Sequence, residues 1–235
     1  MADQQATERG SLLGTLVNIF VSPREAYEAI DRQPRWVLPL VIVIIAAVVA
    51  GMFVAPMAME ERMAEQRDKL IEQRGMTPEQ ADQALAVGAK IGKITAPIMA
   101  AVGSVVVIVV VALALLFLGN VILGGESSFK KLFAMYAWTS LIGVLATIVK
   151  VPLMLSRGTA NVQTSLAALL DPGQKGTFLY QLLTHTDVFS LWQLLLVCIG
   201  MAVIYRFTVK KATTGVVPLY VIYAVVAAVI GAALT

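Results

Sequence analysis

The chain has 235 residues, of which 58% are hydrophobic and only 14% charged, and its mean hydropathy is +0.80. An ordinary soluble domain carries about 25% charged residues, so this composition excludes a simple soluble domain and a disordered chain. It indicates a membrane protein of one compact unit. The net charge of +3 is too small to favour nucleic acid as a partner. One cysteine and one histidine supply neither a disulfide framework nor a zinc site, so we expect no metal and no cofactor.

Residues 1–35 are predicted to form a cytoplasmic, interfacial segment. No apolar run precedes Leu12, so a cleavable signal peptide is not expected. Between Leu12 and Phe20, apolar residues recur at helical spacing. The run Ser22-Pro23-Arg24-Glu25 matches a capping box that would start a second short helix. The apolar face of that helix would carry Ala26, Tyr27 and Ile30. We therefore expect two short helices lying on the membrane surface before Trp36 marks the interface.

Residues 36–235 are predicted to form a transmembrane domain of five helices. A helix needs about 20 apolar residues to cross ~30 Å of hydrocarbon, and backbone groups cannot stay unpaired in lipid. The fourth tract is marginal, because only 18 residues separate Asp187 from Arg206. The predicted fold class is therefore all-α and polytopic. The five spans are expected at about 36–58, 94–123, 132–155, 187–208 and 213–234.

Residues 59–93, between the first two spans, hold 13 charges, six basic and seven acidic. Gly75 should break the helix there, and Thr77-Pro78-Glu79-Gln80 matches a second capping box. This segment is predicted to be an extramembrane helical hairpin whose arms continue the first and second spans. Within the spans, small residues four apart, such as Gly51 with Ala55, should let helices approach closely, in one bundle or between two copies.

The orientation follows from the lysines and arginines of the short loops. With the N-terminus inside, the two sides hold nine of these residues each. Six of the outer nine lie in the hairpin, where they are interleaved with acidic residues. We therefore give these six less weight as an orientation signal, which favours the N-terminus inside. We expect a cytoplasmic N-terminus and an outer C-terminus. Lys150 would then lie at the interface opposite Lys131, where its stem can snorkel; the alternative is a charge in a pore.

The loop between the second and third spans is the candidate interaction site. Its residues are Gly124, Gly125, Ser128, Phe129, Lys130 and Lys131. The glycines can end one helix, and Ser127 or Ser128 can cap the next. Two lysines in the first turn of a helix are disfavoured by the helix dipole, so something offsets this cost. The loop is either an orientation signal or a docking site with Phe129 as its apolar anchor and the lysines reading an anionic partner or lipid headgroup.

The run from Gly124 to Trp138, GGESSFKKLFAMYAW, resembles the corresponding segment of the YIP-domain (Ypt/Rab-interacting) membrane family, bacterial branch. Three further motifs agree in order: Ser22–Ala26 followed by Pro34–Trp36, Met76–Gln80, and Trp192…Gly200…Tyr205. The resemblance implies a five-helix membrane protein with a cytosolic N-terminus, here in a bacterial inner membrane. Eukaryotic members of the family are linked to Rab GTPases and vesicle traffic.

Two classes of function remain open. A membrane scaffold or adaptor, which organises membrane protein partners or lipids, fits the charged hairpin and the surface helices. A small permease or channel is the alternative, although no predicted span carries an ionisable residue at its centre. We do not expect an enzyme, because no nucleophile, paired-carboxylate or metal set is present in the sequence. The expected partners are the lipid bilayer and either membrane proteins or a second copy of the chain.

Overall fold

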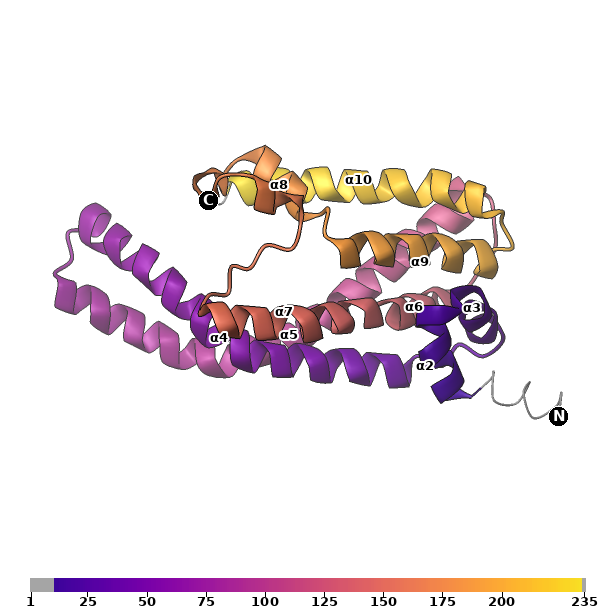
Figure 1. Ribbon diagram of the computed structural model, residues 1–235, viewed down its shortest axis with the longest axis horizontal. Coiled ribbons are helices and arrows are strands. Elements are labelled where there is room, and N and C mark those ends of the chain that lie inside the picture. The colour runs from indigo at the N-terminus through magenta and orange to yellow at the C-terminus, as the bar shows by residue number, and fades with distance from the viewer. Residues whose placement is uncertain (1–10, 234–235) are drawn as a thin grey trace. The chain divides into compact units, whose positions relative to one another are not determined.

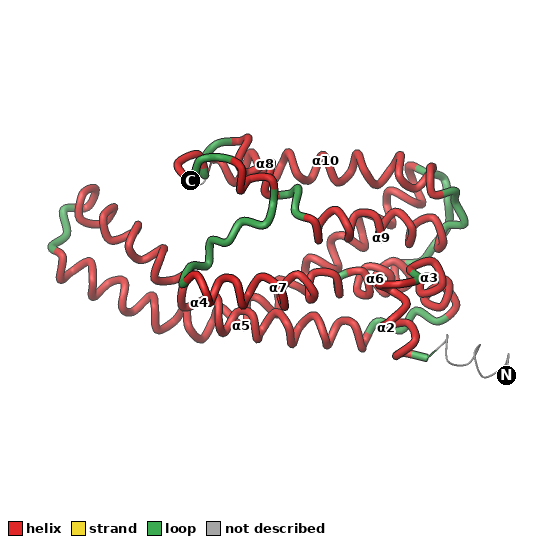
Figure 2. The backbone as a smooth tube through the Cα atoms, viewed as in Figure 1, coloured by secondary structure: helices red, strands yellow, loops and turns green. Residues whose placement is uncertain are grey.

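The computed structural model describes residues 11–233, apart from the side chains of residues 64, 65, 93 and 172. Within that range every regular element is a helix and no strand occurs (Figure 2). The chain forms two compact units. Unit 1 comprises residues 1–42, 106–143 and 163–235, and unit 2 comprises residues 43–105 and 144–162. The predicted all-α class is confirmed.

Unit 1 begins with the two predicted short helices, α2 (Leu12–Val21) and α3 (Pro23–Arg32). Pro23 stands in the first turn of α3 as expected, but the Ser22 side chain makes no capping hydrogen bond. The reason is that Ser22 also ends α2, where its backbone N–H donates to the Asn18 carbonyl at 2.8 Å. Its ψ of 63° lies far from the extended geometry of a capping residue, so the capping-box prediction is wrong at Ser22.

Helix α3 packs against α6 (Phe129–Thr139) and α9 (Val188–Ile204) within unit 1. Its predicted apolar face is buried, and Tyr27 is completely so. A Cβ atom on Gly200 of α9 would lie 3.2 Å from the Tyr27 ring, so the glycine lets α9 come close to α3. The apolar face of α3 therefore serves the interior of unit 1, where the sequence suggested only a membrane surface.

The remaining helices supply the predicted spans. Four helices in the described range are long and apolar enough to cross a membrane: Val37–Arg74, Ile94–Ile122, Phe129–Arg157 and Val209–Ala233. The first is α4. The second combines the end of α5 (Pro78–Phe117) with the π-helix η1 (Leu118–Ile122). The third is α6 followed by α7 (Leu141–Arg157), and the fourth is α10. Leu234, where the last span was expected to end, lies outside the described residues.

The fourth predicted span, at about 187–208, is too short in the structure to cross a membrane as a single helix. Helix α9 has 17 residues, and α8 (Phe178–Thr184) precedes it at an angle of 61°. The two helices count as a fifth span only if they are taken together. Asp187 starts α9 by accepting the Phe189 backbone N–H at 2.9 Å. Two short 3-10 helices, η2 (Leu166–Leu169) and η3 (Pro172–Gln174), lie on the connection before α8.

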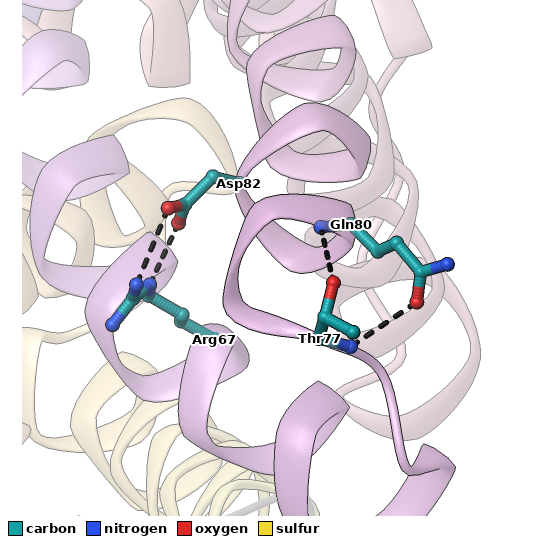
Figure 3. A network of polar contacts seen from close by, with 4 residues as sticks. All are labelled: Arg67, Thr77, Gln80 and Asp82. Carbon is teal, nitrogen blue, oxygen red and sulfur yellow. Dashed lines mark hydrogen bonds and ion pairs between the residues drawn. The ribbon is translucent and has the colours of Figure 1, made fainter.

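Unit 2 is built on the predicted hairpin, in which α4 and α5 turn at Gly75 (φ 61°) and run antiparallel (Figure 1). The second capping box is confirmed: Gln80 N–H donates to Thr77 Oγ1 at 3.3 Å, and Thr77 N–H donates to Gln80 Oε1 at 3.1 Å. Arg67 and Asp82 join the two arms at 2.6 and 3.2 Å (Figure 3). Arg67 lowers the pKa of the Asp82 carboxyl, chiefly by this hydrogen bond.

The two arms also meet within the apolar part of unit 2. A Cβ atom on Gly51 would lie 3.5 Å from the Pro97 Cα and 3.6 Å from the Ala100 Cβ. These are ordinary van der Waals distances, so α4 and α5 approach closely at small residues, as the spacing of those residues predicted.

Candidate functional site

The structure fixes the candidate loop through its glycines. Gly124 has φ 67°, the positive angle predicted for the end of the second span. Gly125 has a different role. A Cβ atom there would lie 2.5 Å from Tyr205 Cδ1 and 2.6 Å from Phe207 Cζ, so glycine is required because the turn between α9 and α10 presses against it. The sequence contained no signal for that contact.

A hydrogen-bonded clasp holds the same loop to the end of α9. The Tyr205 hydroxyl donates to Asn120 Oδ1 at 2.7 Å. Asn120 in turn donates to the Ser127 carbonyl at 3.1 Å and accepts the Ser127 N–H at 3.2 Å. Neither predicted serine cap forms: Ser128 makes no side-chain capping bond, and the buried Ser127 hydroxyl has no hydrogen-bond partner. Asn120 and Tyr205 therefore position the loop, and nothing in the sequence indicated this contact.

The last three residues of the candidate site divide into inward and outward positions. Lys131 Nζ donates to Asp31 Oδ1 of α3 at 2.5 Å, and both side chains are partly buried. Lys130 is exposed, and Phe129 is 38% exposed while its ring lies 5.6 Å from that of Phe133. Lys131 thus forms an ion pair within the protein, whereas Phe129 and Lys130 lie on the surface.

These contacts gather basic residues at one end of unit 1. We call this the basic end: α3 with Arg35, the loop 123–131, and residues 205–211. It holds eight of the nine lysines and arginines described in unit 1, against four carboxylates. The ninth, Lys175, lies beside α8, which packs on the far part of α10. The basic residues are Arg24, Arg32, Arg35, Lys130, Lys131, Arg206, Lys210 and Lys211.

Unit 1 also contains a cavity of about 390 Å³ among α5, α6, α9 and α10. Valines and leucines form much of its wall, and its polar lining residues are all neutral or aromatic: Tyr136, His185, Ser190, Gln193, Tyr220 and Tyr223. Tyr220 donates to the His185 carbonyl at 2.6 Å, which anchors α10 to the end of α8. Nothing in the sequence revealed that His185, the single histidine, borders a cavity. Among the described residues, no three His, Cys, Asp or Glu side chains come together as a metal site.

The long apolar helices show that this is a multi-pass membrane protein that contacts the lipid bilayer. A comparison with models of known protein families identifies the family. The Yip1 domain matches residues 17–230, which is nearly the whole chain, so the chain belongs to the Yip1 domain family. This confirms the resemblance seen in the sequence motifs. Comparison with curated proteins and with solved structures gave no match.

Proposed function

We propose that the protein is a membrane adaptor of a bacterial cytoplasmic membrane and that its basic end is the docking face, on the cytoplasmic side. The observation that carries the proposal is the gathering of basic residues from α3, the loop 123–131 and the start of α10. Short segments rich in lysine and arginine are retained in the cytoplasm. The N-terminal helices would then be cytoplasmic, the C-terminus and the hairpin tip outside.

The loop has the properties of a preformed recognition surface. The clasp between Asn120, Ser127 and Tyr205 fixes its backbone, so little conformational entropy would be lost on binding. Phe129 offers an exposed apolar ring, and Lys130 offers an exposed charge beside it. An anionic membrane protein partner fits this combination. The competing explanation is that the lysines serve only to orient the chain.

Photo-crosslinking in membranes separates the two explanations. A photoreactive residue replaces Glu126, which is exposed on the loop. We expect a crosslinked protein that is lost in Phe129→Ala and Lys130→Gln but kept in Lys130→Arg. Lys175→Gln, which removes a lysine away from the basic end, is the matched control and should keep it. The docking role is refuted if the crosslink survives both loop substitutions, or disappears only when labelling shows that the topology has inverted.

A permease or channel is the second candidate, because Lys150 borders an open surface pocket of about 510 Å³ in unit 2. Small residues of α4 and α5, including Gly51 and Ala100, line the same space, together with Thr147. A charged group inside a membrane commonly marks a transport path. If Lys150→Leu changes ion flux in reconstituted vesicles without lowering stability, the permease would replace the adaptor as the favoured function. Unchanged flux favours a lysine that snorkels to the interface.

A further inference from the structure

A groove of about 400 Å³ lies at the basic end, between α3 and the turn that joins α9 to α10. Three arginines from separate places in the sequence line it: Arg24 and Arg32 from α3, and Arg206 from the turn. Two carboxylates, Glu28 and Asp31, also line it. The candidate loop itself is not part of the groove wall, so this is a second surface of the basic end.

Both carboxylates of the groove already have cationic partners. Glu28 accepts from Arg24 Nε at 3.3 Å, and Asp31 accepts from Lys131 Nζ at 2.5 Å. Arg32 and Arg206 have no carboxylate within 4.0 Å among the described residues. The groove therefore contains two guanidinium groups that form no ion pair with a described carboxylate, and its three arginines outnumber its two carboxylates.

The backbone at Arg206 is unusual for an arginine. Its φ is 56°, in the left-handed region, and it is the one described residue other than glycine with a positive φ. The Arg206 N–H donates to the Val203 carbonyl at 3.2 Å, and the Phe207 N–H donates to the Ala202 carbonyl at 2.8 Å. This pair of bonds is the Schellman ending of α9, in which the left-handed position is usually glycine. Glycine would satisfy the turn without steric strain, so the helix ending itself does not explain the arginine.

The groove borders the turn between α9, which ends at Ile204, and α10, which begins at Val209. Because α10 and the α8–α9 pair are long and apolar enough to cross a membrane, we expect this turn at a membrane surface, where lipid phosphates are found. Val203 and Phe207 give the groove an apolar side, suited to the glycerol and acyl region below a headgroup. The planar guanidinium group binds phosphate oxygens in a bidentate manner, and basic pockets between membrane helices bind anionic lipid headgroups.

We propose that this groove binds the phosphate of an anionic phospholipid, held by Arg32 and Arg206. The site is independent of whether the loop docks a protein partner. A bound lipid would bridge α3 to the α9–α10 turn and thereby hold the N-terminal helices against the rest of unit 1. It would also compensate the like charges that the fold brings together there.

Native mass spectrometry of the purified full chain tests the proposal, with phosphatidylglycerol and phosphatidylcholine as probes. We expect phosphatidylglycerol to bind at least tenfold more tightly than phosphatidylcholine, and Arg32→Gln and Arg206→Gly each to reduce that preference severalfold. Lys210→Gln, which removes a charge from the same end but outside the groove, is the matched control and should retain it.

Arg206→Gly gives the sharper result, because it removes the guanidinium and relieves the left-handed strain together. We expect its thermal stability in lipid-free detergent to equal or exceed that of the unsubstituted chain while its lipid preference falls. Equal phosphatidylglycerol binding by the unsubstituted chain and both arginine variants would overturn the proposal. An equal loss in Lys210→Gln would do so too, since it would indicate diffuse attraction. Displacement of the lipid by millimolar inorganic phosphate would show a site for free anions and overturn the lipid assignment.

Discussion

The buried hydroxyl of Tyr27 joins α3 to α6. It lies 2.7 Å from Thr139 Oγ1, whose own proton goes to the Met135 carbonyl at 2.8 Å, so Tyr27 is the donor. Both residues are fully buried. A buried hydroxyl that loses its partner is left without the hydrogen bonds that water would supply. This single contact therefore helps to decide whether the N-terminal helices stay docked.

We expect Tyr27→Phe to lower the free energy of unfolding by about 1–2 kcal/mol. Burial also raises the pKa of the Tyr27 phenol above its ordinary 10.0. Because the pKa is higher in the folded state, the stabilisation is complete below about pH 10 and is lost as the pH rises further. Denaturation in mixed micelles should thus show a steeper loss of stability above pH 10 in the unsubstituted chain than in Tyr27→Phe. Parallel profiles would contradict the prediction.

Lys131 shows what offsets an unfavourable charge in the first turn of a helix. Its partner is Asp31, whose side chain is 21% exposed, so solvent screens the pair less than a fully exposed one. The Asp31 carboxylate offsets the unfavourable interaction of Lys131 with the helix dipole. The sequence indicated that such a partner should exist but did not show which residue it is. The pair also fastens the end of α3 to the start of α6.

We expect Asp31→Asn to destabilise the protein by about 1 kcal/mol, because Lys131 then faces the helix dipole unpaired. Lys131→Gln in the Asp31→Asn background should add no further loss and should recover part of the first one, since it removes the unpaired charge from the start of the helix. Glu28→Gln is the matched control: it breaks the exposed pair with Arg24, whose side chains are 79% and 46% exposed, and should have a much smaller effect. Chemical denaturation in micelles measures all three. An equal loss in Glu28→Gln would rule out a special role for Asp31.

At the scale of single elements, the hairpin between α4 and α5 depends on local interactions near its tip. The reciprocal bonds of Thr77 and Gln80 start α5, and the pair between Arg67 and Asp82 bridges the arms (Figure 3). These groups are exposed, and the buried apolar side chains described near them, Ala81 and Leu85, supply only a small core. The tip should consequently be among the regions of the molecule that open most readily.

Thr77→Ala should accelerate amide hydrogen exchange at residues 80–82 about fivefold, because losing a helix cap costs about 1 kcal/mol. Thr95→Ala is the control within the same helix. Its hydroxyl bonds only to the Ile91 carbonyl one turn earlier, so its removal should leave the tip unchanged. Exchange followed by mass spectrometry gives both rates. Protection at 80–82 that is insensitive to Thr77→Ala would show that the cap does not limit opening.

For the whole molecule, the charge distribution of unit 1 bears on the orientation in the membrane. Counted along the sequence, the two sides carry equal numbers of basic residues. Within unit 1, in contrast, eight of nine described lysines and arginines lie at one end. Helix α10 has 25 residues and leads from that end for about 37 Å at ~1.5 Å per residue. This length suffices for one crossing, so the C-terminus should lie on the other side.

We therefore expect the basic end inside and the hairpin tip outside. In a variant with Cys198 replaced by Ala, a membrane-impermeant maleimide should label Gln73→Cys in intact cells but label Glu126→Cys only after lysis. A fluorescent protein fused after Thr235 should stay dark, because it would fold poorly outside the cytoplasm. Labelling of Glu126→Cys in intact cells, or a C-terminal fusion as bright as an N-terminal one, would reverse the proposed orientation.

Features that depend on local spacing were predictable from the sequence alone. The uncharged tracts predicted the spanning helices, because a chain in lipid has no alternative to internal backbone hydrogen bonds. The break at Gly75 and the capping box at Thr77 followed from residues within one helical turn of each other. The family was recognisable from short motifs for the same reason. The candidate loop could be proposed from the sequence, but its contacts with α3 and with the end of α9 could not.

Only the tertiary structure decided which residues meet across the chain. The partner of Lys131 stands 100 residues away, and the groove joins Arg32 to Arg206 from opposite ends of the sequence. Gly125 needs to be glycine because of two aromatic rings about 80 residues further on. Ser22 fails as a cap because a second helix ends on it. In each case the outcome depends on how helices pack, and helical periodicity specifies which face of a helix is apolar but not which helix it meets.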